Sequence, residues 1–148
     1  MPEILNLHNF SENNVVSLKH EQGQVLLLDF WATWCPPCQK PMAHNQEMVE
    51  AHKKAGDWKN VRIIGLSIDD SLEKLKDHVV ENGWESVEHY WTGRPDCKAS
   101  DEWNITGVPY CVLVDTEGKI AWSGHPSSMN LEEAIIKLLN KETLSYLN

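Results

Sequence analysis

Apolar and polar stretches alternate along the first half of the chain in a pattern that predicts strands followed by helices. The short apolar runs 25–30 (VLLLDF) and 61–68 (VRIIGLSI) are typical of strands buried on both faces of a sheet. A longer mixed stretch, 39–55, follows the first run, and a second lies between Ser71, a candidate N-cap, and Gly83. The order strand, helix, strand, helix predicts a parallel sheet with covering helices.

The second half predicts an antiparallel addition to this sheet. The run 108–115 (VPYCVLVD) is a third strand, 116–118 (TEG) is a turn, and 119–123 returns as a hairpin partner. In the segment 131–139, the apolar positions 131, 134, 135, 138 and 139 have helical spacing. This segment is therefore expected to form an amphipathic helix that lies on the sheet.

A small hairpin is expected ahead of the first central strand. Its strands are 4–8 and 15–18, and Asn13 and Asn14 between them tolerate left-handed turn geometry. No repeat, low-complexity tract or linker interrupts the chain, and 148 residues suit one domain with a full core. We expect a single α/β domain over residues 1–148, with a mixed central sheet, helices on both faces and a short N-terminal hairpin.

Composition and charge limit the classes of binding partner and the cellular location that we expect. Hydrophobic residues make up 41% of the chain and charged residues 24%, an ordinary balance for a globular protein. The net charge of −9 argues against nucleic acid or an anionic membrane as the main partner, because both select clustered Lys and Arg. No run approaches the roughly 20 apolar residues of a membrane span. The start, MPEILNLHNF, lacks the basic and apolar segments of a secretory signal. We expect a cytoplasmic monomer, with an exported form as the alternative.

The four cysteines are unevenly distributed. Cys35 and Cys38 stand three residues apart in the stretch WCPPC, whereas Cys97 and Cys111 lie far from them and from each other. Four cysteines are too few for a small disulfide-stapled scaffold of this length. The spacing therefore indicates one special pair and two other cysteines, and in a reducing compartment a close pair is catalytic or metal-binding.

The close pair falls where the first central strand ends and a helix begins. If Cys35 is the N-cap, the two prolines occupy the first helical positions, where a missing N–H costs little. Cys38 then supplies the first free N–H, which we expect to point toward the Cys35 sulfur. This N–H and the positive end of the helix would stabilise a thiolate and lower the pKa of Cys35. The spacing also lets the two sulfurs form a disulfide. Cys35 is the predicted attacking sulfur, and Cys38 the resolving one.

Two other uses of paired cysteines are disfavoured. A structural zinc site takes about four ligands, commonly as two close pairs, and the chain has no second C-x-x-C and no H-x-x-H. A structural disulfide across so small a loop would add little chain-entropy stabilisation. We expect no metal, and a redox role for Cys35 and Cys38.

On these residues the chain resembles the thioredoxin superfamily, most of all its TlpA-like, nucleoredoxin-like and tryparedoxin-like branches. The resemblance covers nearly the whole chain and is carried, in family order, by LLDFWATWCPPC, VRIIGLSID and ITGVPYCVLVDTEGKIAWSG. It implies a thioredoxin-like fold and a thiol–disulfide oxidoreductase of cell redox homeostasis, which reduces protein disulfides through Cys35 and Cys38. It implies no bound cofactor: an external dithiol or flavoprotein reductase would recycle the redox-active Cys35–Cys38 disulfide.

The resemblance also assigns residues to the substrate surface. Pro109 matches the proline that in this family follows a cis peptide bond and lies beside the active-site disulfide. The backbone of Val108 would then face outward and pair with an extended substrate segment, as in strand addition. Trp34, which precedes the attacking cysteine, and Pro36 would border the same surface.

Asp29 lies at the place of the family's buried aspartate, six positions before Cys35. A carboxylate is costly to bury on an apolar strand, so the pKa of Asp29 should rise, and it could accept a proton from Cys38 during resolution. The alternative is a partly solvated residue at the end of a strand.

The remaining cysteines have less specific interpretations. Cys111 is expected to be a buried, inert thiol, because free cysteine behaves as a small apolar residue. Cys97 lies in the polar stretch RPDC and is expected to be exposed. An alternative for the whole chain is a redox-sensing adaptor that keeps the fold and the strand-addition surface but has no significant turnover.

Overall fold

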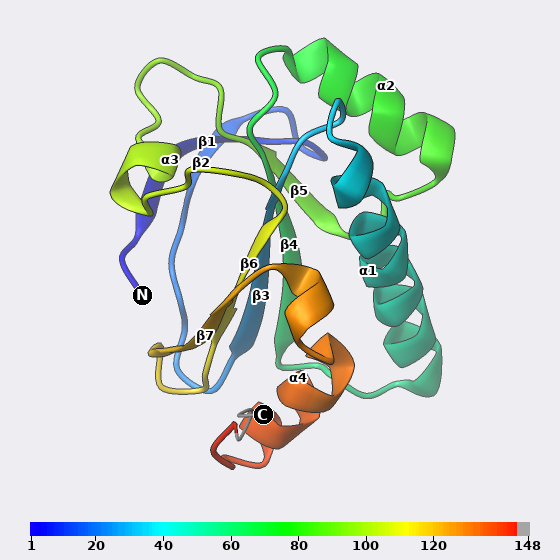
Figure 1. Cartoon of the computed structure of the whole chain (residues 1–148), viewed down its shortest axis with the longest axis vertical. Coiled ribbons are helices and arrows are strands. Elements are labelled where there is room, and N and C mark those ends of the chain that lie inside the picture. Colours follow the sequence, from blue (N-terminus) through cyan, green and yellow to red (C-terminus); the bar gives the residue numbers. More distant parts are fainter. Residues whose placement is uncertain (145–148) are drawn as a thin grey trace.

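The computed structural model describes residues 1–144, which form a seven-stranded mixed sheet with strand order β2-β1-β5-β4-β3-β6-β7 (Figure 1). The strands β3, β4 and β5 are parallel, whereas β6 is antiparallel to β3 and continues into β7. The elements are, in chain order, β1 Ile4–Asn9, β2 Val15–Leu18, β3 Val25–Trp31, α1 Pro36–Ala55, β4 Val61–Ser67, α2 Leu72–Asn82, β5 Glu88–Trp91, the short α3 Ala99–Glu102, β6 Tyr110–Val114, β7 Ile120–Gly124, the 3₁₀ turn η1 Pro126–Ser128, and α4 Leu131–Leu139.

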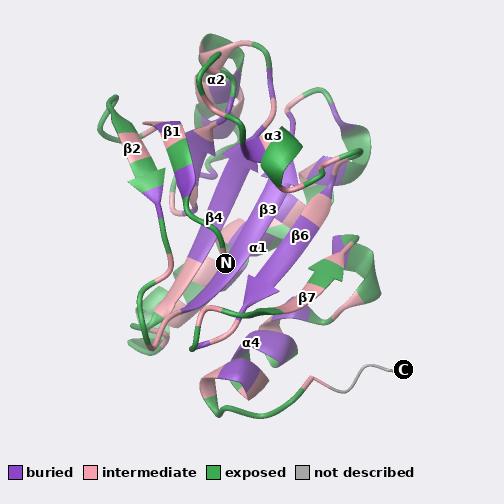
Figure 2. Cartoon of the chain, turned by 90° about the vertical axis from the view of Figure 1, so that its left-hand side faces the viewer, coloured by how far each residue is buried: buried purple, intermediate pink, exposed green. Residues whose placement is uncertain are grey.

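The central strand β3 is buried along its whole length because both of its edges and both of its faces are covered. Leu28, for example, pairs with Ile64 of β4 on one side and with Val112 of β6 on the other. Every residue of β3 is buried, in agreement with the uninterrupted apolar run in the sequence (Figure 2).

Two hydrophobic cores lie on the two faces of the sheet. Residues of α1, α2 and α4 pack with Leu27 and Trp31 of β3 on one face. On the other face, residues of the N-terminal hairpin and of α3 pack with Leu26, Leu28 and Phe30. Figure 1 shows the same division, with α1, α2 and α4 on one side of the sheet and α3 on the other. The expected mixed sheet, flanking helices and N-terminal hairpin are therefore confirmed.

The helix caps follow from local sequence. The Ser71 hydroxyl accepts a hydrogen bond from the Lys74 N–H at 3.2 Å, as its position predicts. Gly56 and Gly83 end α1 and α2 in the left-handed region, with φ of 77° and 70°, where a side chain would be strained. No helix of residues 1–144 combines the length and the apolar character that a membrane span requires.

The helix α1 begins at Pro36, as the expected N-cap at Cys35 implies, and so includes the mixed stretch 39–55 and the three residues before it. Two other expectations of secondary structure were incomplete. The strand predicted over 108–115 spans only Tyr110–Val114, and the cis peptide bond before Pro109 lies in the loop ahead of it. The short elements β5 and α3 were not predicted.

Candidate active site at the start of α1

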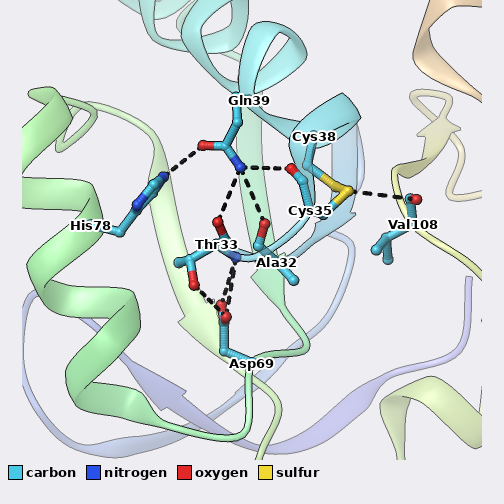
Figure 3. Close-up of a disulfide and its surroundings, with 8 residues drawn as sticks. All are labelled: Ala32, Thr33, Cys35, Cys38, Gln39, Asp69, His78 and Val108. Carbon is cyan, nitrogen blue, oxygen red and sulfur yellow. Dashed lines mark hydrogen bonds between the residues drawn. A yellow bond between two sulfur atoms is a disulfide. The ribbon is translucent and has the colours of Figure 1, made fainter.

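The site is built where β3 ends and α1 begins. The connecting residues, 32–35, are fixed from one side by Asp69, which follows β4 and is buried. Its carboxylate accepts hydrogen bonds from the Thr33 N–H at 3.1 Å and from the Thr33 hydroxyl at 2.6 Å (Figure 3). Because β3 and β4 are parallel, their carboxyl ends meet at this edge of the sheet, which brings Asp69 to the loop.

Cys35 and Cys38 are joined by a disulfide at the N-terminus of α1, with a Cα–Cα distance of 5.3 Å. Cys35 is the N-cap residue, and the two prolines occupy the first positions of the helix, as predicted. Cys35 is 4% exposed and Cys38 is fully buried. Of the two sulfurs, Cys35 is thus the one that a substrate disulfide could approach.

The expected contact between the Cys38 N–H and the Cys35 sulfur is wrong. The Cys38 N–H instead donates to the carbonyl oxygen of Cys35 at 3.1 Å, and the Cys35 side chain caps no N–H of the helix. The sulfur is bonded to Cys38 and lies 3.7 Å from the carbonyl oxygen of Val108 (Figure 3). The carbonyl oxygen of Cys35, rather than its sulfur, thus accepts the hydrogen bond of the Cys38 N–H.

The loop before β6 brings a second segment to the disulfide. The peptide bond between Val108 and Pro109 is cis, as the resemblance implied. Antiparallel pairing of β6 with β3 sets Tyr110 opposite Phe30 and so places this bond beside the start of α1. Trp34 is 64% exposed next to the disulfide. Val108 and the cis bond therefore lie beside the Cys35 sulfur, and the exposed Trp34 directly precedes Cys35 in the chain. Contact of Trp34, Val108 and Pro109 with substrate stays a prediction.

Asp29 lies fully buried beneath the site, so the solvated alternative is wrong. Burial raises the pKa of Asp29 to about 7, and hydrogen bonding with Cys111 and Asn45 opposes this rise only in part. Asn45 of α1 donates to the carboxyl Oδ2 at 2.9 Å, and Cys111 is the residue opposite Asp29 on β6. A carboxyl group with this pKa can gain or lose a proton near neutral pH.

The two other cysteines differ in burial. Cys111 is fully buried, as expected, and burial together with the neighbouring Asp29 raises its pKa well above the ordinary range. A thiol of this kind is a poor nucleophile at neutral pH. The prediction that Cys97 is exposed is wrong: it is half-buried, because its loop folds onto the core beside α3. Within residues 1–144, no group of three or more His, Cys, Asp or Glu side chains could hold a metal ion.

A groove of about 850 Å³ runs from the active-site turn to the segment between β7 and α4. One wall is the first turns of α1, with Pro36, Lys40 and His44, and the other is 125–131, with His125. Although the chain carries 22 acidic and 13 basic residues, no acidic residue among the described positions 1–144 lines this groove. The groove thus offers an extended, partly basic surface beside the disulfide.

Four residues of the site were missed by sequence reasoning: Gln39, Asn45, Asp69 and His78. For Asn45 a signal exists, because it shares one face of α1 with Cys38, Met42 and Met48, all buried. Asp69 and His78 join the site through contacts between distant segments, for which one sequence gives no signal. Gln39 contacts the nearby carbonyl of Cys35, but its amide also contacts His78, 39 positions away.

Comparison with known proteins agrees with this geometry. The thiol-disulfide oxidoreductase ResA of Bacillus thuringiensis subsp. konkukian is 27% identical over 139 residues, which are 86% of this chain and 70% of the relative. A thiol:disulfide interchange protein DsbE of Allochromatium vinosum is 31% identical over 98 residues, 66% of this chain and 49% of the relative. Among solved structures, the thioredoxin domain of a thiol-disulfide oxidoreductase from Bacteroides vulgatus superposes with a TM-score of 0.75 and 26% identity, covering 94% of both chains.

The chain also matches a protein family as a whole. Residues 23–120 match the family described as thioredoxin-like, and they extend from the turn before β3 to the start of β7. Both paired cysteines and the cis-proline lie inside the matched region. The chain belongs to the thioredoxin-like family.

Proposed function

We infer that the chain is a thiol–disulfide oxidoreductase that reduces protein disulfides by dithiol–disulfide exchange through Cys35 and Cys38. The observation that carries this function is the Cys35–Cys38 disulfide at the start of α1, beside the cis bond before Pro109. The names of the relatives, thiol-disulfide oxidoreductase and thiol:disulfide interchange protein, support the same class of activity.

The exchange takes place in two steps. The Cys35 thiolate attacks one sulfur of the substrate disulfide, forms a mixed disulfide and releases the first substrate thiolate, which takes a proton from solvent. The Cys38 thiol loses its proton and attacks the Cys35 sulfur, which releases the second substrate thiolate. Two electrons have then passed to the substrate, and the Cys35–Cys38 disulfide remains. An external dithiol or flavoprotein reductase must return two electrons.

Asp29 is the proposed acceptor of the Cys38 proton. Its carboxyl lies beneath the face of α1 that carries Cys38, since Asn45 on the same face donates to it. With a pKa of about 7, Asp29 is ionised in a large fraction of molecules at neutral pH. A base whose pKa is near the working pH is suited to proton transfer.

The substrate segment is proposed to lie across Trp34, Pro36 and the Val108–Pro109 turn. Two observations support this proposal: Cys35 is 4% exposed whereas Cys38 is fully buried, and the Cys35 sulfur lies 3.7 Å from the carbonyl oxygen of Val108. Extended peptides bind such backbone turns by main-chain hydrogen bonds, and the exposed indole of Trp34 adds apolar area.

Reduction, rather than oxidation, is the proposed direction. We propose a monomer that acts in the cytoplasm, where the thiol pool keeps such pairs reduced. Potentials of reducing thioredoxins lie near about −270 mV, whereas strong oxidants lie near about −120 mV. A reduction potential of the Cys35–Cys38 pair closer to the first value would support this direction.

Insulin reduction by dithiothreitol tests the activity. The wild-type chain should accelerate insulin precipitation, and Cys35→Ser should abolish the acceleration because no attacking sulfur remains. Cys38→Ser should trap a mixed disulfide on Cys35 that is visible by mass spectrometry. If Cys35→Ser were as active as wild type, or if wild type bound insulin without reducing it, the oxidoreductase proposal would fall and the adaptor alternative would stand.

A further inference from the structure

The side-chain amide of Gln39 contacts several backbone carbonyl oxygens of the active-site loop. Gln39, the residue after Cys38, points its Nε2 at the carbonyl oxygens of Cys35 at 2.7 Å and of Thr33 at 3.3 Å, with that of Ala32 at 3.5 Å (Figure 3). The contact with Cys35 is short, at the lower end of the usual range for an N–H···O hydrogen bond. Gln39 thus joins the helix turn that carries Cys38 to the loop that carries Cys35.

His78 of α2 determines which way this amide faces. Its Nε2 lies 2.6 Å from Gln39 Oε1, which can only accept a hydrogen bond, so the proton of the imidazole must be on Nε2. Because the amide oxygen is held by His78, the amide NH₂ group is turned toward the loop carbonyls. The imidazole is itself packed against the rings of Trp31 and Trp84, with centroid distances of 6.1 and 5.6 Å.

The loop is therefore fixed from two sides. Asp69 accepts hydrogen bonds from the Thr33 N–H and hydroxyl. Gln39 donates to the carbonyl oxygens of Thr33 and of Cys35, which carries the attacking sulfur. The carbonyl of Cys35 accepts two hydrogen bonds, from Gln39 and from the Cys38 N–H. The separation of the two cysteines is thus maintained by hydrogen bonds outside the disulfide itself.

We propose that Gln39 and His78 are positioning residues for the step in which Cys38 closes the disulfide: His78 orients the Gln39 amide, and this amide holds Cys35 where Cys38 can reach it. The proposal rests on the proposed function, since it concerns the second step of the same exchange. Through His78, the helix α2 would then influence disulfide closure, although α2 supplies neither cysteine.

The expected effect follows from the value of one hydrogen bond. A hydrogen bond between partly buried groups contributes about 1.4 kcal/mol, which is a factor of about ten in an equilibrium constant. Ring closure depends on the effective concentration of Cys38 at the Cys35 sulfur, which falls when the turn is free to move. Removal of the Gln39 contacts should therefore reduce, about tenfold, the equilibrium constant for forming the Cys35–Cys38 disulfide with glutathione. The reduction potential of this pair should become about 30 mV less negative.

Four variants separate positioning from general stability. Gln39→Leu and His78→Leu remove the amide donor and its orienting group, and both should show the tenfold change and a longer-lived mixed disulfide. His78→Gln should restore wild-type values, because its side-chain NH₂ can donate to the Gln39 oxygen. Gln46→Leu is the matched control: it removes another hydrogen bond of a side-chain amide on α1, which the Gln46 Oε1 accepts from the Ser86 N–H at 2.9 Å and which involves no residue of the active-site loop. It should lower the melting temperature and leave the equilibrium constant unchanged.

The outcomes are distinct from those for the proposed function. If wild type fails to exchange with glutathione or insulin, the oxidoreductase proposal itself is wrong. If wild type exchanges, but Gln39→Leu and His78→Leu keep its equilibrium constant and its mixed-disulfide lifetime, the positioning role is overturned. It is also overturned if Gln46→Leu changes these two quantities as much as Gln39→Leu does, or if His78→Gln behaves like His78→Leu.

Discussion

Replacing Asp29 with asparagine should stabilise the protein above neutral pH while it slows disulfide exchange. Burial raises the pKa of Asp29 from 3.8 to about 7. Since the folded-state pKa lies above that of the unfolded chain, ionisation of Asp29 destabilises the fold increasingly between about pH 4 and pH 7, and the full penalty is present above pH 7. Each pKa unit corresponds to about 1.4 kcal/mol, so the penalty is of the order of 4 kcal/mol.

Asparagine removes this penalty with little other change. It has nearly the same shape as aspartate, and its amide oxygen can still accept the hydrogen bond that Asn45 donates at 2.9 Å in the wild type. The difference in unfolding free energy between Asp29→Asn and wild type should therefore be near zero at pH 4 and reach a few kcal/mol at pH 8. The resolution step, by contrast, should slow about tenfold or more, because Cys38 has lost its proton acceptor.

Urea unfolding of both oxidised proteins at several pH values measures this difference directly. Other titrating groups cancel, because they are common to the two proteins. A difference that stays constant from pH 4 to pH 8 would refute the raised pKa. A variant that gains stability but resolves mixed disulfides at the wild-type rate would refute the role of Asp29 in proton transfer.

Three further changes test other parts of the structure. Burial lowers the pKa of His52, but hydrogen bonds to Glu132 and Asp57 outweigh this effect and raise it. The resulting stabilisation is less than about 1 kcal/mol, because the side chains of both carboxylates are about half exposed. It is fully present below about pH 6.5 and is lost as the pH rises through the folded-state pKa. Thermal melts of His52→Gln should thus show less loss of stability between pH 6 and pH 8 than wild type, and parallel curves would contradict this. Lys40→Glu should slow the reduction of disulfide peptides with acidic flanks several-fold, with neutral-flanked peptides as the control, because Lys40 lines the groove; equal rates would exclude an electrostatic role for it. Cys97→Ala should keep wild-type insulin reduction, since Cys97 is a half-buried free thiol packed against the core beside α3, and loss of turnover in a folded variant would implicate it in the exchange.

The parts of the fold that sequence predicted are those with strong periodic patterns. Five apolar positions at helical spacing placed α4 at Leu131–Leu139, and the buried runs placed β3 and β4. The strand β5 was missed because it has four residues, EHYW, and only two of them are buried. A strand this short is specified by its pairing with β4 rather than by its own pattern.

The residues of the candidate site also fall into two groups, those that local sequence predicts and those that only the packing of distant segments brings together. Cys35, Cys38 and the two prolines are neighbours in sequence, so local rules for helix starts sufficed to place them. The direction of the Cys38 N–H was predicted wrongly, because those rules do not show that the Cys35 carbonyl would accept it. The contact of Gln39 with His78 joins residues 39 positions apart, and only the packing of α2 beside α1 brings them together.

The most direct test of the account is the rate of alkylation of each cysteine in the reduced protein at neutral pH, followed by peptide mass mapping. The account predicts that iodoacetamide modifies Cys35 first and much faster than an ordinary thiol, because the positive N-terminal end of α1 stabilises its thiolate. It also predicts that oxidation joins Cys35 to Cys38 and protects both. Modification of Cys35 at the rate of an ordinary thiol, with no disulfide to Cys38 after oxidation, would contradict it.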